Sequence, residues 1–250
     1  MISFLITVCD EHFELQRLLH QLSYIVKDTD EIVVVYDSTK VTKEVKNEIS
    51  KSKAQSYSYE FSGDFSEYKN FANTKCTKDW ILQLDADEFL SDSLAYNIHS
   101  FLKDAEDIEF IAIPRVNIVK RITEKHILNW GWALGKDETY FDVDELNINS
   151  EEYKLLKNYK FIVSEQDTIS EDVKSIRHYS PIINYPDYQG RLYRNNPNIK
   201  WEGKVHEKIV GYKNFGKIPF DNGFDILHFK DIARQEKQNS YYGILESDRK

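Results

Sequence analysis

Apolar runs of strand length alternate with amphipathic segments along the first half of the chain. Residues 3–8 and 32–36 form two such runs, and apolar residues at helical spacing follow each of them. In the first of these helices Leu15, Leu18 and Leu22 recur at i, i+3 and i+7. Alternating strand and helix units are typical of a mostly parallel sheet that is covered by helices. The pattern therefore predicts an α/β fold.

The alternation continues to residue 116, and then the pattern changes. From residue 120 to 180 the chain is polar and rich in aromatic residues, which indicates an insertion for which no element is predicted. We predict a single domain over residues 1–250, in which residues 181–250 form a mixed second half. The elements predicted after residue 50 are strands at 57–61, 80–84, 108–116, 190–193, 199–201, 206–210 and 225–229, and helices at 65–76 and 232–245.

Acidic residues follow three of the predicted strands. Asp10, Asp37 and Asp85 each lie just past the carboxyl end of a strand. In open α/β sheets ligands collect at this edge, because loops converge there and helix N-termini offer amide donors. Helix N-capping is the alternative for Asp10 and Asp37. The strand ends therefore predict where a ligand site would lie.

The segment Leu84-Asp85-Ala86-Asp87-Glu88 contains an Asp-x-Asp motif. Two carboxylates on one side of an extended turn can hold a hard divalent cation. Mg²⁺ or Mn²⁺ at this point would bridge two phosphates and neutralise charge on a leaving diphosphate. The alternative is a solvated acidic turn that caps the next helix. The apolar strand at 80–84 favours the metal site, because a solvated turn does not need to lie at the edge of a sheet.

The formal net charge of −9 argues against a broad basic face for nucleic acid. An acidic protein that binds a diphosphate needs local cations, and a bound metal ion would supply them. Cys9 and Cys76 lie far apart and form no Cys-x-x-Cys group, so neither a disulfide framework nor a zinc site is indicated. This cysteine usage fits a reducing cytoplasm, with peripheral attachment to the inner face of the membrane as a further expectation.

The apolar start of the chain resembles a signal peptide only superficially. Residues 1–8 are too short to span a bilayer, no basic residue precedes them, and Asp10 and Glu11 follow at once. We therefore expect a first strand here and no transmembrane segment.

Several motifs, in order along the chain, carry a family resemblance. They resemble the family 2 glycosyltransferases of the GT-A fold, and those of the second half resemble the bacterial branch that includes lipopolysaccharide-core glucosyltransferases. The resemblance spans residues 1–116 and 186–245 and leaves the insertion out. The motifs are Asp37-Ser38-Thr39, Tyr68-Lys69-Asn70, Trp80-Ile81-Leu82-Gln83-Leu84-Asp85-Ala86-Asp87-Glu88, Arg191-Leu192-Tyr193-Arg194-Asn195 and Ile199-Lys200-Trp201-Glu202-Gly203-Lys204-Val205-His206-Glu207.

The resemblance implies a hexosyltransferase that takes a sugar from a nucleotide diphosphate donor, with a UDP-sugar expected. The acceptor would be a hydroxyl of a glycan, a lipid-linked molecule or another compound, and the anomeric carbon would be inverted. Residues 1–116 would form the nucleotide-sugar-binding half and residues 181–250 the acceptor side. Asp37 would accept from the imide N–H of uracil. The expected donor-binding residues are Thr7, Asp10, Glu11, Asp37, Lys69, Asn70, Asp85 and Arg191.

The resemblance also suggests candidates for the catalytic base and the metal ligands. An inverting transfer needs a carboxylate within hydrogen-bond reach of the acceptor hydroxyl. Glu207 is the candidate by its position in the motif, and Glu88 is the rival. His206 and His228 are each open to a role as a metal ligand, a diphosphate contact or a structural strand residue. The expected metal ligands are therefore Asp87, Asp85, His206 and His228, with Mn²⁺ or Mg²⁺ as the cofactor.

Two further side-chain pairs have open interpretations. Arg191 and Arg194 stand at i and i+3 in a strand and face opposite ways, so only Arg191 is expected to meet a phosphate. Trp130 and Trp132 in the insertion could share one face and stack on a sugar, or they could form a small core under a long loop.

Three other functions are alternatives to transfer onto a glycan or lipid-linked acceptor. A phage or viral enzyme that glycosylates modified DNA bases would keep the fold, but the acidic charge argues against it. A non-catalytic nucleotide-sugar binding module is opposed by the presence of Asp85, Asp87 and Glu207. A nucleotidyltransferase would need a Gly-rich basic loop after the first strand, and residues 7–11 lack it.

Overall fold

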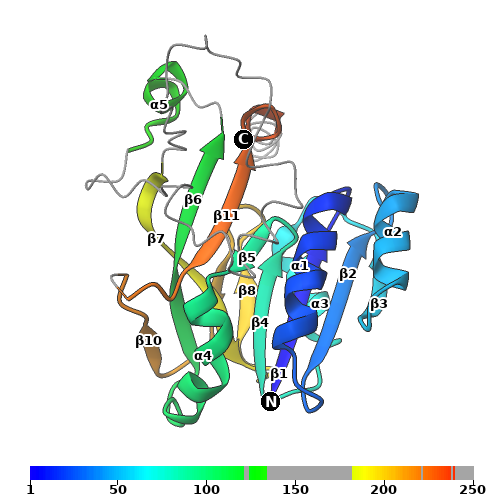
Figure 1. The fold of residues 1–250 in the computed structure, drawn as a ribbon, viewed down its shortest axis with the longest axis vertical. Coiled ribbons are helices and arrows are strands. Elements are labelled where there is room, and N and C mark those ends of the chain that lie inside the picture. Colours follow the sequence, from blue (N-terminus) through cyan, green and yellow to red (C-terminus); the bar gives the residue numbers. More distant parts are fainter. Residues whose placement is uncertain (121–123, 134–181, 221, 238, 240–250) are drawn as a thin grey trace, which may run out of the picture.

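The computed structural model describes residues 1–120, 124–133, 182–220, 222–237 and 239. Within them, nine strands form one large mixed sheet and two strands form a small second sheet. The large sheet has the order β3-β2-β1-β4-β7-β6-β11-β5, with β10 beside β6 (Figure 1). The strands are β1 (Ile2–Val8), β2 (Glu31–Asp37), β3 (Gln55–Tyr59), β4 (Trp80–Asp85), β5 (Glu88–Leu90), β6 (Phe110–Lys120), β7 (Ile182–Arg194), β10 (Phe215–Lys217) and β11 (Ile226–Asp231), and the small sheet pairs β8 (Lys200–Glu202) with β9 (Lys208–Val210).

Five helices accompany the sheets in the described residues, and three of them begin at a side-chain cap. Thr42, Asp64 and Ser91 each accept a hydrogen bond from a backbone N–H in the first turn of the helix that follows. The helices are α1 (His12–Ile25), α2 (Lys43–Ser50), α3 (Phe65–Asn73), α4 (Asp92–Lys103) and α5 (Glu124–Trp130).

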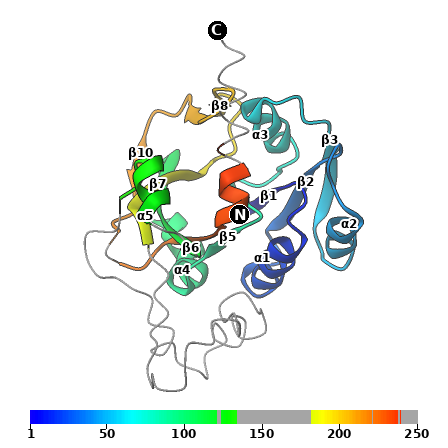
Figure 2. The same ribbon diagram turned by 90° about the horizontal axis from the view of Figure 1, so that it is seen from above.

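The large sheet is buried on both faces, and the alternation along β1 shows how. Phe4 and Ile6 point into a core that is completed by α1, α2 and α4, whereas Leu5 points into a second core beneath α3 and the small sheet. Figure 2 shows α1 and α4 on one side of the sheet and α3 with β8 on the other. Burial on both faces explains why the sequence of β1 is an almost continuous apolar run.

The strand directions bring several chain ends to one edge. β1 runs parallel to β2 and β4, and β11 runs parallel to β6. β7 is antiparallel to both β4 and β6, so β6 and β11 point the same way as β4. The arrowheads of β2, β4, β6 and β11 accordingly face the same edge in Figure 1. Asp37 and Asp85, which end β2 and β4, and Asp87 in the turn after β4 therefore lie at the same edge as the carboxyl end of β11.

The α/β fold class with a mostly parallel sheet and a mixed second half is confirmed, and the predicted elements before residue 85 are present. The second half differs in its bounds. β7 is far longer than the predicted strand at 190–193, and β9 begins only at Lys208. In the first half, β5 and α4 have no predicted counterpart. The predicted closing helix is seen as a helical stretch over residues 232–237, and its remainder lies outside the described residues, as does most of the 120–180 insertion.

Candidate functional site

Asp85 ends β4, and both of its carboxylate oxygens accept hydrogen bonds from the protein. Oδ2 accepts from Arg191 Nη2 at 2.5 Å, and Oδ1 accepts from Thr7 Oγ1 at 3.0 Å and Gln83 Nε2 at 3.2 Å. Burial would raise the pKa of Asp85, but the positive charges of Arg191 and Lys69 hold it well below its usual range. Asp85 is therefore an ionised carboxylate that three side chains of the protein bind.

Arg191 lies at the centre of a buried ion network. It also donates to Glu88 Oε1 at 2.7 Å and to Gln83 Oε1 at 2.6 Å. Arg115 Nη1 donates to the same oxygen of Glu88 at 2.8 Å, and Glu88 Oε2 accepts from the backbone N–H of Asp85 at 3.0 Å. Glu88 is 0% exposed, and both of its oxygens bind protein donors. Glu88 therefore holds the turn and the two arginines together.

Asp87 has a different partner, although it is only two residues further along. Its Oδ2 lies 3.3 Å from Nε2 of His228 on β11. The other ring nitrogen of His228, Nδ1, lies 2.9 Å from Asn117 Oδ1 on β6. Because Asn117 Oδ1 can only accept, Nδ1 carries a proton and Nε2 is the atom that faces Asp87. Asn117 is fixed in turn by donating to Asp187 Oδ2 at 2.8 Å, and Arg115 donates to the same oxygen at 2.6 Å.

The pair formed by Asp87 and His228 fits a divalent cation. A carboxylate oxygen and an imidazole nitrogen converge, and the amide of Asn117 accepts from the other ring nitrogen and so fixes the ring, as hydrogen-bond partners of metal-binding histidines do. Burial would raise the pKa of Asp87, but His228 more than offsets this and the net shift is downward. Among the described residues no three His, Cys, Asp or Glu side chains are grouped for a metal, so this pair is the candidate set of side-chain ligands.

Glu207 lies in the loop between β8 and β9, where it meets α3. Its Oε1 accepts from Nζ of Lys69, whose ammonium also lies 4.3 Å from the centroid of a Trp201 ring. Asn70 fixes β8 through the backbone of Trp201, donating to its carbonyl and accepting from its N–H at 2.8 Å each. The charge of Lys69 acts on Asp85 as well, so α3 connects Glu207 with the ion network.

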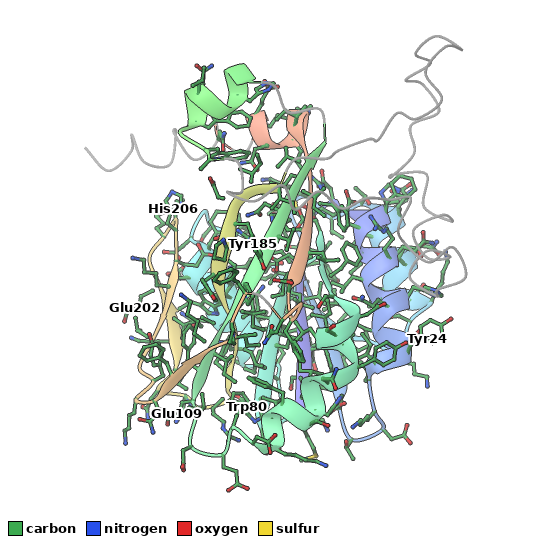
Figure 3. All side chains as sticks on the ribbon, turned by 60° about the vertical axis from the view of Figure 1, so that its left-hand side comes forward. Tyr24, Trp80, Glu109, Tyr185, Glu202 and His206 are labelled. Carbon is green, nitrogen blue, oxygen red and sulfur yellow. The ribbon has the colours of Figure 1, made fainter. Side chains whose placement is uncertain are left out.

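His206 is exposed in a bend with φ of 57°, just before β9 begins. Figure 3 shows it at the outer end of the loop between β8 and β9. The description of His206 as a strand residue is therefore wrong, and the partner of Asp87 is His228.

The residues expected near the nucleotide base lie at the ends of β1 and β2. Asp37 is 3% exposed, and its Oδ1 accepts from the backbone N–H of Thr39 at 2.9 Å and from its hydroxyl at 2.7 Å. Arg234 Nη2 lies 3.2 Å from Asp10 Oδ1 and 3.4 Å from Glu11 Oε1. Burial raises the pKa of Glu11 in spite of Arg234. The helical stretch after β11 thus contacts the loop after β1.

Several residues of this site were not among the expected ones, Gln83 and Arg234 among them. Arg115 and Asn117 stand in β6, and Asp187 stands opposite Arg115 in β7. Lys230 follows His228 on β11, where burial and the charge of Arg115 lower its pKa to about 8. A sequence signal existed for Arg115 and Asn117, because both interrupt an otherwise apolar strand. By contrast, the expectation that Arg191 and Arg194 face opposite ways is met, since Arg194 lies 4.1 Å from a Trp80 ring centroid.

This architecture is the GT-A fold of glycosyltransferases. The structure of S. aureus TarS 1-349 matches it with a TM-score of 0.53 over 91% of this chain at 12% identity. TarS 1-349 in complex with UDP-GlcNAc and in complex with UDP each match with a TM-score of 0.53 over 92% of the chain, at 13% and 14% identity. At such identities the likeness establishes the fold alone.

The chain spans 60% of the length of the TarS 1-349 structure. In sequence it matches no protein-family model and no curated protein. In the part of the chain that the structure describes, every helix is too short or too polar to cross a bilayer.

Proposed function

We propose that this protein is a metal-dependent inverting glycosyltransferase that moves a sugar from a UDP-sugar to a hydroxyl of a glycan or lipid-linked acceptor. The observation that carries the proposal is the pair of Asp87 and His228 at the carboxyl edge of a GT-A sheet. The crystallised complexes of TarS with UDP-GlcNAc and UDP, on the same fold, support a nucleotide-sugar donor. The resemblance to family 2 supports inversion.

Asp87 and His228 are the residues that would hold the cation. When bound there, Mn²⁺ or Mg²⁺ would neutralise charge on the leaving diphosphate. Asp85 is included in this proposal as the residue that positions the turn, because Arg191, Thr7 and Gln83 already bind both of its oxygens. Three donors leave a carboxylate, which has about four acceptor positions, with little remaining capacity for direct coordination by Asp85.

The nucleotide would lie along the ends of β1 and β2. Asp37 has one oxygen bound by Thr39, which orients the carboxylate and leaves its other oxygen to accept from the imide N–H of uracil. Glu11 and Asp10 would line the same pocket, where Arg234 now pairs with both.

Glu207 is the proposed base. Lys69 orients its carboxylate through one oxygen, and the second oxygen is then available to take the proton of an acceptor hydroxyl. Glu88 is less suited to this role, because it is completely buried and both of its oxygens bind protein donors.

Calorimetric titration with UDP and with GDP, each with and without MnCl₂, tests the donor part of the proposal. UDP should bind the wild-type protein only when Mn²⁺ is present, and Asp87→Asn should weaken this binding by at least a hundred-fold, since outer ligands alone are worth ten- to a hundred-fold. Failure of UDP to bind in the presence of Mn²⁺ would end the proposal, whether or not GDP binds.

Hydrolysis of UDP-sugars separates an enzyme from a binding module. We expect slow, Mn²⁺-dependent release of UDP by the wild-type protein and by Glu207→Gln, with transfer to an acceptor lost in Glu207→Gln alone. Binding of UDP-sugars with no hydrolysis and no transfer to any glycan acceptor would favour the non-catalytic module.

A further inference from the structure

The basic side chains around the site differ in their partners. Arg191, Arg115, Lys69 and Arg234 each form an ion pair with at least one carboxylate. Lys230 instead lies 5.3 Å from a ring centroid of Trp132, and among the described residues none accepts a hydrogen bond from its ammonium. An ammonium group carries three donors, and leaving them unused in a largely enclosed place is unfavourable. Lys230 therefore has donors available for a bound anion.

The register of β11 places Lys230 beside the proposed metal ligands. His228 stands opposite Asn117 on β6 and opposite Glu88 on β5. Because side chains alternate along a strand, Lys230 shares the face of His228 and lies about 7 Å closer to the carboxyl edge. β5 is antiparallel to β11, so the same register continued by two residues brings Lys230 level with Ala86 in the Asp-x-Asp turn.

The charges that act on Lys230 agree with this placement. They come from Arg115, Asp87, Asp187 and Glu88, which are the members of the network on the His228 side of the site. The ammonium also lies over the ring of Trp132, against which Trp130 packs edge-on at 4.8 Å between ring centroids. A phosphate group bound next to Asp87 and His228 would replace water as the acceptor for Lys230.

We propose that Lys230 binds the diphosphate of the nucleotide-sugar donor and stabilises it as the leaving group. The inference rests on the proposed function. As the bond between the anomeric carbon and the diphosphate oxygen breaks, its electron pair stays on that oxygen, and the N–H groups of Lys230 stabilise the added negative charge. The acceptor oxygen forms the new bond to the anomeric carbon, and its proton passes to Glu207.

Titration of UDP in the presence of MnCl₂ tests the assignment without requiring an acceptor. Lys230→Met removes the charge and keeps the length of the side chain, and it should weaken UDP binding about ten- to a hundred-fold, the usual range for a hydrogen bond to a charged group. Lys230→Arg should bind UDP within a few-fold of wild type. Lys217→Met is the matched control, because Lys217 also lies over an aromatic ring, that of Tyr188 at 3.5 Å, but on β10. It should bind UDP as wild type does.

Competition by uridine, which has no phosphate, separates a phosphate contact from a structural role. Lys230→Met should leave the affinity for uridine unchanged while that for UDP falls. Unchanged UDP affinity in Lys230→Met, or an equal loss for uridine and UDP, would overturn the assignment and leave the proposed function standing. Absence of UDP binding by the wild-type protein would overturn both. If Lys230→Met does not fold, Lys230→Gln is measured in the same way, and the same outcomes decide.

Discussion

Asp85 and Asp87 are separated by one residue, yet their carboxylates face two different parts of the protein. Arg191 on β7, Thr7 on β1 and Gln83 on β4 together bind both oxygens of Asp85. Asp87 faces β11, where its described partner is the imidazole of His228. The permanent cation beside Asp85 comes from the chain itself, whereas the partner of Asp87 is an imidazole, a side chain that can bind a metal ion. The motif thus combines a fixed anchor, Asp85, with the proposed cation ligand, Asp87.

The difference has a physical cause in the strand neighbours of the turn. β7 contributes Arg191, whose charge does not depend on pH in the physiological range, and β11 contributes a histidine whose ring is fixed by Asn117. The chain Asn117, Asp187 and Arg115 connects the two sides through hydrogen bonds. Stability and cation binding should therefore respond to different substitutions.

Removal of the anchor should have the largest effect. Arg191→Met leaves Asp85 and Glu88 buried with fewer partners, and breaking a buried ion pair from one side costs about 3–5 kcal/mol of unfolding free energy. Urea unfolding followed by circular dichroism measures the loss. Arg194→Met on the opposite face is the control, with an expected loss of about 1 kcal/mol from hydrogen bonds to backbone carbonyls. Equal losses in the two variants would mean that Arg191 is no more important for stability than Arg194.

Loss of the amide that orients His228 should weaken binding at the proposed cation site. Asn117→Leu should lower the affinity for Mn²⁺ and UDP by about ten- to a hundred-fold, because outer residues of metal sites have effects of this size. Gln189→Leu is the control, since Gln189 donates to Asp187 at 2.7 Å but has no contact with His228. Calorimetry with UDP and MnCl₂ gives the comparison. Wild-type affinity in Asn117→Leu would mean that Asn117 does not orient a ligand.

The smallest effect is expected from the hydroxyl that binds Asp85. Thr7→Val keeps the shape and removes one donor to Asp85, which should cost about 1 kcal/mol of unfolding free energy. The folded-state pKa of Asp85 is depressed below 3.8, so this contribution is complete above that pH and disappears as the pH falls through the folded-state value. Unfolding at several pH values between 2 and 7 measures the trend, and Thr7→Ser is the control that keeps the hydroxyl. A difference between Thr7→Val and wild type that grows toward low pH would contradict the assignment.

The first half of the fold could be predicted from periodicity because its strands are parallel and buried on both faces. Such strands are continuous apolar runs with helices between them, as β1 and β2 show. β7 could not be bounded in the same way. It carries polar residues and Pro186, and it is held in the sheet by pairing with β6 and β4, which sequence spacing does not reveal. β5 has only three residues, too few for a periodic signal.

The candidate site could be predicted as a set of residues, but their pairings could not. The motif located Asp85, Asp87 and Arg191, and the structure brings them to one edge. The choice between His206 and His228 depends on which strand lies next to β5, and neither local motif contains that information. The sequence alone did not indicate Lys230, because its role depends on residues on neighbouring strands and on Trp132, which is far away in the sequence.

The position of β11 has a consequence for how the protein acquires its site during synthesis. β11 follows every other strand of the large sheet in the sequence, yet it lies inside that sheet, between β6 and β5. A nascent chain that emerges from the ribosome N-terminus first exposes the open edges of β6 and β5 until β11 arrives. Both edges can pair with other strands in that interval. Arrival of β11 closes them and brings His228 to Asp87, so the pair proposed to hold the cation forms only when the sheet is complete.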